Sequence, residues 1–146
     1  MVIIMKWFKS TLNISTHHRG FHDITEKINA QIKSWNVQEG IIFLFLQHTS
    51  ASLVINEDYD ASARRDMENL FDELIPEGAS WYEHTIEGED DSPAHLRTMI
   101  THTHLSIPVD GGRLTLGTWQ GIFLAEHRQR GHNRQIQLRM LSVEGD

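Results

Sequence analysis

Apolar residues early in the chain recur at the spacing of a helix. Ile24, Ile28, Ile32 and Trp35 fall three or four residues apart, which places them on one helical face. Asp23 precedes them, and its side chain can accept a hydrogen bond from the first free backbone N–H groups. The pattern predicts an amphipathic helix that ends before the apolar run that follows.

Other segments follow the spacing of strands. Ile41–Gln47 (IIFLFLQ) is a continuous apolar run, and it predicts a strand buried on both faces at the centre of a sheet. Ser50–Asn56 predicts a second strand, and Trp7–Ile14 is typical of an edge strand. From Leu105 onward, strands are expected in LSIPV, RLTLG, WQGIFLAEH and RQIQLRML, with a turn at Gly111–Gly112 after the first. The last segment alternates apolar and polar residues, which indicates a strand buried on one face.

Two further helices are predicted among these strands. Asn56 can cap the first, with Glu57 in its first turn, and Pro76 ends it. The apolar stripe of this helix consists of Tyr59, Ala63, Met67, Leu70, Phe71 and Leu74. Ser92–Pro93 is typical of a helix start, so a short helix is expected from Pro93 to about Ile100.

Runs of strands with segregated helices predict an α+β protein. We expect a mixed or antiparallel sheet with two to three helices. No repeat or Pro/Gly/Ser linker divides the sequence, so residues 1–146 are expected to form a single compact domain.

Composition and charge exclude several classes of function. The chain has no cysteine, which excludes thiolate metal sites and cysteine nucleophiles and favours a reducing compartment, so the cytoplasm is expected. Its net charge of −7 argues against a general nucleic-acid binder, because affinity for the phosphate backbone requires a basic surface. The opening MVIIMKWF has too short an apolar run for a signal peptide or a membrane span.

Three of the ten histidines lie where strands or loops are expected to end: His48, His84 and His95, the last in the first turn of its helix. Zinc favours imidazole ligands and uses three protein ligands in catalytic sites, so these residues are candidates for a metal site. Histidines on loops are also commonly solvated or hydrogen-bonded for structural reasons. The acidic loop between His84 and His95 has the same two interpretations, a magnesium site or solvent-facing charge.

Basic and aromatic residues near the C-terminus are candidates for binding an anion. The segment EHRQRGHNR is either a hairpin loop with Gly131 at its turn or a group of arginines that bind phosphate oxygens. The segment GTWQG places Trp119 and Gln120 between two glycines, which indicates either a close approach by a ligand or a buried tryptophan in the core.

Several motifs together resemble one family across nearly the whole chain. They are LQHTSASL, the pair Asn56–Glu57, RRDME, YEHTIEGEDDSPAHL, IPV, LGTWQGI and AEHR. In this order they resemble the YjbQ family, whose members are also described as secondary thiamine-phosphate synthase enzymes. The resemblance implies a compact α+β protein with a β-sandwich-like core. It also implies a homotrimer with a histidine metal site formed by His48, His84 and His95.

The resemblance also implies an activity and residue roles. The activity condenses a pyrimidine pyrophosphate with a thiazole phosphate, which makes the protein a transferase. Zinc is the expected ion, with magnesium as an alternative for a pyrophosphate substrate. Four further motif positions are candidates for catalysis: we expect Glu57, Glu126 or His127 to transfer protons and Arg128 to neutralise the departing pyrophosphate. The residues implied for substrate binding are Asn56, Asp91, Trp119 and Gln120, and Arg130 and Arg134 of EHRQRGHNR are added as candidates for binding phosphate oxygens.

Two other functions stay open on the residues alone. One is a metal-dependent hydrolase of a small phosphate-bearing substrate, which needs the same cation, acid–base group and anion-binding groups. The other is a non-catalytic ligand-binding module whose histidines are structural.

His102 and His104, in ITHTHLS, stand where the family commonly has a glycine-containing turn, and they add two imidazoles to the candidates. A small phosphorylated molecule is the expected partner, with no nucleic acid and no membrane.

Overall fold

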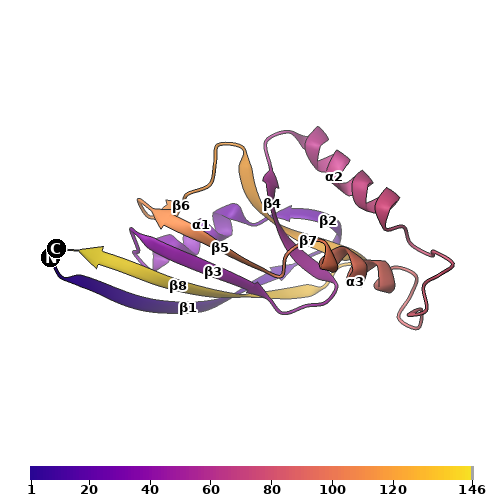
Figure 1. Cartoon of the computed structure of the whole chain (residues 1–146), viewed down its shortest axis with the longest axis horizontal. Coiled ribbons are helices and arrows are strands. Elements are labelled where there is room, and N and C mark those ends of the chain that lie inside the picture. Colours follow the sequence, from indigo (N-terminus) through magenta and orange to yellow (C-terminus); the bar gives the residue numbers. More distant parts are fainter. Residues whose placement is uncertain (146) are drawn as a thin grey trace.

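Two antiparallel sheets and three helices make up the fold of the computed structural model, which describes residues 1–145 (Figure 1). The larger sheet has the strand order β1-β8-β3-β5-β6, and the smaller has the order β2-β7-β4. The strands are β1 (Ile3–Ser15), β2 (His18–Asp23), β3 (Gly40–Leu46), β4 (Ala51–Glu57), β5 (His104–Asp110), β6 (Arg113–Leu114), β7 (Gln120–Arg130) and β8 (Asn133–Gly145). The helices are α1 (Thr25–Ser34), α2 (Ala61–Leu74) and α3 (Asp91–Met99). The predicted α+β class with a sandwich-like antiparallel core is confirmed.

The main core lies between the two sheets and is closed by α1. Inward residues such as Leu44 of β3 and Leu124 of β7 alternate with residues of the opposite faces, as strand geometry requires. Ile28 and Ile32 of α1 are fully buried in the same cluster, which confirms the helix predicted from their spacing. A smaller cluster on the other face of the small sheet packs Phe71 of α2 against Phe21, Phe123 and Ala125.

One long antiparallel ribbon links the sheets. β1 pairs with β8 over their whole lengths, and in Figure 1 this ribbon carries both termini away from α2 and α3. At the other end of the ribbon, β1 leads into β2 and β8 follows β7, so both strands connect to the small sheet. There the backbone N–H of Thr16 donates to the carbonyl of His132 over 3.0 Å. The hairpin predicted for EHRQRGHNR is therefore wrong, because β7 and β8 belong to different sheets and do not pair. Gly131 does lie between them, where a Cβ atom would collide with the Thr16 carbonyl oxygen.

β3 lies at the centre of the larger sheet, as predicted, but it is not buried on both faces. Phe43 is 39% exposed and Phe45 is 50% exposed, whereas Ile42 and Leu44 are buried. No helix covers the outer face in the described structure, so the apolar run reflects a sheet with one packed and one open apolar face. We call this surface, with Trp7 beside Phe43, the outer face.

Both later helices begin at positions other than those predicted. Asn56 and Glu57 belong to β4, and Asp60 caps α2 by accepting a hydrogen bond from the Ser62 backbone over 2.8 Å. The helix ends before Pro76, as predicted, but of its apolar stripe only Phe71 is buried.

The third helix, α3, begins earlier than predicted. It begins at Asp91, ahead of Pro93, so Asp91 and His95 lie one turn apart on it. None of the helices over residues 1–145 is long and apolar enough to cross a membrane.

Candidate metal centre

His84, Asp91 and His95 form a cluster at the start of α3. The Nε2 atoms of His84 and His95 lie 2.7 Å and 3.0 Å from the same carboxylate oxygen, Oδ2 of Asp91. One ligand atom from each residue lies within 4.8 Å of the others. The carboxylate is almost fully buried, whereas the side chains of His84 and His95 are 54% and 36% exposed. The three donors therefore face a common point that solvent can reach.

The orientation of the His95 ring is fixed by a hydrogen bond at Nδ1, the ring nitrogen that faces away from Asp91. Its Nδ1 atom lies 2.7 Å from the carbonyl oxygen of Thr49, in the loop that leads into β4. A carbonyl oxygen only accepts hydrogen bonds, so Nδ1 carries a proton, and Nε2 is the ring nitrogen that faces Asp91. Protein ligands to metals are commonly held in this way, with the second imidazole nitrogen bonded to a carbonyl.

Arg128 of β7 holds the acidic side of the cluster. Its Nη1 donates to Oδ1 of Asp91 over 2.8 Å, its Nε donates to Asp90 over 2.9 Å, and its Nη2 donates to the carbonyl of Glu87 over 3.1 Å. Burial raises the pKa of the Asp91 carboxyl, but the hydrogen bond to His84 and the charges of His95 and Arg128 outweigh it, so the pKa lies below its usual value. Asp91 is therefore ionised near neutral pH, and Arg128 is a positioning residue whose donors are already occupied.

His48 lies outside the cluster. Its Nε2 accepts a hydrogen bond from the backbone N–H of Gln135 over 2.9 Å, which directs the ring toward β8. Asp91 takes the place expected for His48, because the earlier start of α3 puts this carboxylate one turn before His95. His102 also lies outside, with its backbone paired to Leu53, and His104 begins β5.

Glu126 and Arg134 form a buried ion pair in place of a substrate contact. Nε of Arg134 donates to Glu126 over 2.8 Å, and Thr16 donates its hydroxyl to the same carboxylate over 2.7 Å. Both charged side chains are at most 3% exposed, so neither reaches a substrate in this conformation. Burial raises the pKa of Glu126, and the bonds from Arg134 and Thr16 more than reverse this shift.

His127 faces the opposite side of β7 from Arg128. Its Nε2 lies 2.8 Å from Oγ of Ser52, and its ring packs edge-on against Phe71. Burial, together with the charge of Arg97, lowers the pKa of His127 to about 3. It is therefore neutral near pH 7 and lies apart from the metal candidates, because successive strand residues point to opposite faces.

The other implied substrate-binding residues lie at the far end of the small sheet. Glu57 pairs with Gln120 and Ala51 with Glu126 in the β4–β7 ladder, so six residues, or roughly 20 Å, separate the two ends. Asn56 and Trp119 are at the Glu57 end, and Trp119 is 56% exposed and packs against Tyr59, so it is not a core residue. Within one chain these residues do not share a pocket with the histidine cluster.

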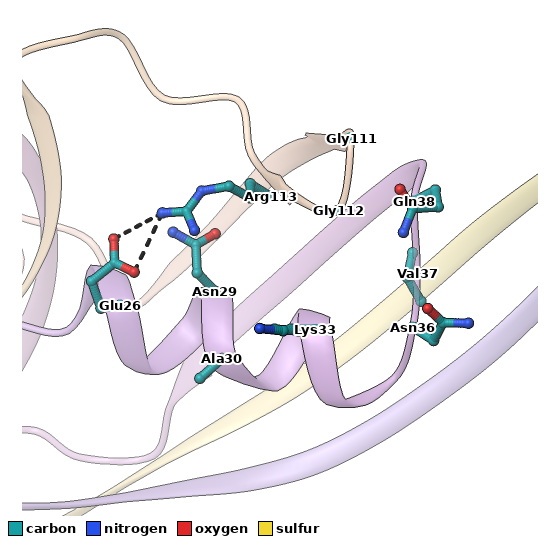
Figure 2. Close-up of a pocket in the computed structure, with 10 residues that line it drawn as sticks. All are labelled: Glu26, Asn29, Ala30, Lys33, Asn36, Val37, Gln38, Gly111, Gly112 and Arg113. Carbon is teal, nitrogen blue, oxygen red and sulfur yellow. Dashed lines mark hydrogen bonds and ion pairs between the residues drawn. The ribbon is translucent and has the colours of Figure 1, made fainter.

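Two cavities clarify the setting of the cluster. Figure 2 shows one cavity, of about 440 Å³, between α1 and the Gly111–Gly112 turn, where Arg113 pairs with Glu26. None of the implied site residues lines it. A second cavity, about 310 Å³, opens beside the cluster and is lined by Glu87, Asp90, Arg128, Gln129, Arg130 and His132. Arg130 is the one implied substrate-binding arginine that lies exposed there.

Sequence reasoning missed three parts of this site. It gave Asp91 a substrate role, because the helix was predicted to begin at Pro93; once the helix begins at Asp91, the spacing of four residues to His95 places both side chains on one face. The contacts from the Thr49 carbonyl and from Asp90 to Arg128 leave no signal in the sequence, because they join distant segments.

The fold and the cluster define a class of protein: two antiparallel sheets with a His–Asp–His cluster at the start of one helix. The chain matches the family model described as UPF0047 protein YjbQ-like over residues 10–143, and it belongs to this family. UPF0047 protein YjbQ of Escherichia coli O157:H7 is 45% identical over 131 residues, which cover 89% of this chain and 94% of that protein. Among solved structures, a YbjQ-like protein of unknown function from Sulfolobus solfataricus P2 has a TM-score of 0.85 at 27% identity, covering 95% of this chain and 99% of that one. A conserved hypothetical protein from Thermus thermophilus has a TM-score of 0.81 at 33% identity, covering 90% of this chain and 98% of that one.

The same comparisons correct the activity implied by the resemblance. The assignment as a thiamine-phosphate synthase and transferase is wrong, because the family is designated UPF0047 and its member from Sulfolobus solfataricus is described as of unknown function. Membership in the YjbQ family itself is confirmed.

Proposed function

We propose that His84, Asp91 and His95 bind one divalent metal ion, with zinc as the expected ion. The observation that carries the proposal is the convergence of two Nε2 atoms on Oδ2 of Asp91, at 2.7 Å and 3.0 Å. Two imidazoles and one carboxylate are a ligand set used by catalytic zinc. Magnesium fits less well, because it prefers oxygen ligands.

The donor set fits the ion in two further respects. His95 is already oriented by the Thr49 carbonyl, and Asp91 is held by Arg128, so neither ligand must reorganise on binding. The partial exposure of His84 and His95 leaves a side open to substrate.

We propose that this site hydrolyses a small phosphate-bearing substrate. A bound divalent ion supplies Lewis-acid charge that polarises a phosphoryl oxygen. The protein's own contribution is the cavity beside the cluster, where Arg130 is free to contact phosphate oxygens. Arg128 has a different part, because its donors hold Asp90 and Asp91 in place.

The test combines metal analysis with a turnover assay. Purified protein is analysed for zinc by mass spectrometry and incubated with p-nitrophenyl phosphate and with inorganic pyrophosphate as probes. We expect zinc-dependent phosphate release that is lost in a His84→Ala, His95→Ala double variant and weakened about tenfold in Arg130→Gln. Phosphate release that is equal in the double variant contradicts the proposal. Zinc binding without turnover of either probe favours the non-catalytic ligand-binding module.

We also propose that the chain forms a homotrimer in the cytoplasm. The outer face supports self-association, because Met5, Trp7, Phe43 and Phe45 are between 39% and 67% exposed on one side of the larger sheet. Contiguous exposed apolar surface of this kind commonly marks an interaction site. The absence of cysteine favours the reducing compartment.

A further inference from the structure

A third cavity, of about 210 Å³, lies against β7 at His127, the residue that faces away from Arg128 and the histidine cluster. Residues of β2, β7, α2 and α3 line it, among them Arg19, Glu68, Phe71, Arg97 and His127. Its volume is below the usual range of about 300–1,000 Å³ for sites that hold drug-sized molecules, so a ligand there must be small. The cavity does not include His84, Asp91 or His95.

Arg97 brings a buried positive charge with an unused donor to this cavity. The side chain is 3% exposed. Its Nη2 donates to the carbonyl of Ile75 over 2.9 Å, at the end of α2, and lies 3.3 Å from Asp72. Among the described residues its Nε is buried without a hydrogen-bond partner. A buried donor without a partner costs free energy, so the arrangement favours an acceptor in the cavity.

Glu68 brings a negative charge with no partner of its own. Within residues 1–145 its carboxylate forms no ion pair or hydrogen bond. It rests against Gly20, where a Cβ atom would lie 3.1 Å from Oε1, so the glycine makes room for the carboxylate. Gly20 has a backbone φ of +143°, a value that residues with a side chain rarely adopt.

The other charges around the cavity are already matched. Arg19 pairs with Glu77, and its Nη2 lies 3.8 Å from Asp72, whose side chain is 55% exposed. Glu126 directs its carboxylate to Arg134 on the opposite face of β7. The Arg97 charge is paired with Asp72, so the groups that still lack a hydrogen-bond partner are the Nε of Arg97 and the carboxylate of Glu68.

We propose that this cavity binds a small zwitterion, a molecule of the size of a small α-amino acid. Its carboxylate accepts hydrogen bonds from Arg97, and its ammonium group donates to Glu68. The Phe71 ring lines the same cavity and offers an apolar surface for a short aliphatic part, with the Arg97 guanidinium 5.5 Å and the His127 ring 5.3 Å from it. The site is independent of the metal centre.

The experiment compares L-alanine with its two singly charged analogues, propionate and ethylamine. Each is titrated into the ¹⁵N-labelled full-length protein, and the Nε–H signal of Arg97, assigned by its absence in Arg97→Lys, is followed by NMR. We expect L-alanine to shift this signal and to bind about tenfold or more tightly than either analogue, because it matches both charges. Equal affinity for propionate, or no shift with L-alanine at tens of millimolar, overturns the proposal.

Matched variants test the role of Glu68 without disturbing the cap on α2. Glu68→Gln should remove the preference for L-alanine over propionate, whereas Glu73→Gln, an exposed residue on the same helix, should retain it. An unchanged preference in Glu68→Gln overturns the assignment of the ammonium site. The His84→Ala, His95→Ala double variant should bind L-alanine as the unaltered protein does, so a failure of the metal proposal is distinguishable from a failure of this one.

Discussion

Asp91 and His95 lie one helical turn apart on α3, and Nε2 of His95 is 3.0 Å from Oδ2 of Asp91. This contact depends on the helix beginning at Asp91, since residues four apart face the same side. The loop that precedes α3 then brings His84 to the same oxygen, at 2.7 Å. A single helix start thus produces two of the three candidate ligands.

The first prediction separates His48 from the cluster. His84→Ala and Asp91→Ala should each lower zinc affinity more than about 100-fold, because each removes one of three donors, a larger loss than the 10–100-fold typical of outer contacts. His48→Ala should lower it less than about threefold, because its Nε2 bonds to the Gln135 backbone. Competition with a fluorescent zinc chelator measures all three, and loss of zinc in His48→Ala would restore the ligand set implied by the family resemblance.

The second prediction concerns the buried pair of Glu126 and Arg134. Arg134→Met should lower the free energy of unfolding by about 3–5 kcal/mol, because it leaves the Glu126 carboxylate buried without its partner. Urea unfolding at pH 7 measures the change. Glu144→Gln is the control, because its ion pair with Lys6 is about half exposed and should contribute less than about 1 kcal/mol. Similar losses in the two variants would show that burial does not govern the Glu126 pair.

The third prediction follows from the lowered pKa of His127. The unfolded imidazole binds a proton below its ordinary pKa of 6.5, whereas the folded one does so only near 3. The unfolded state therefore binds more protons between these values, and stability falls as the pH drops from 6.5 toward 3. At pH 5 the loss from this group is about 2 kcal/mol.

His127→Gln should remove that part of the pH dependence. Urea unfolding at pH 7.5, 6 and 5 for both proteins isolates it, because the carboxylates that titrate over the same range are common to the two. Parallel stability profiles for the two proteins would contradict the buried, neutral imidazole.

The fourth prediction tests the outer face. Phe45 is 50% exposed at the centre of this face, so Phe45→Glu should introduce charge into a subunit interface and dissociate the proposed trimer. Sedimentation equilibrium measures the mass, expected to fall from three chains to one. Leu74→Glu, on α2, is the control, because Leu74 is also exposed but lies away from this face. Dissociation by Leu74→Glu alone would place the interface on the helical side.

Local elements could be predicted from the sequence wherever one physical signal dominates. The apolar spacing of Ile28 and Ile32 fits one buried face of a helix, and α1 forms there. Pro76 cannot continue a helix, and α2 ends before it. The family resemblance rests on the same local order of motifs, and the family is confirmed.

Tertiary structure alone decided the rest, because the deciding contacts join segments far apart in the chain. The apolar run around Phe43 and Phe45 predicts a strand buried on both faces. The packing of the sheets shows instead that one face of this strand is exposed to solvent. The Glu126 and Arg134 side chains have the chemistry of a phosphate site, but burial pairs them with each other. The four-residue spacing of Asp91 and His95 is visible in the sequence, but the hydrogen bond from the Gln135 backbone that keeps His48 out of the cluster is not, since hydrogen bonds between such distant segments are set by how the layers pack.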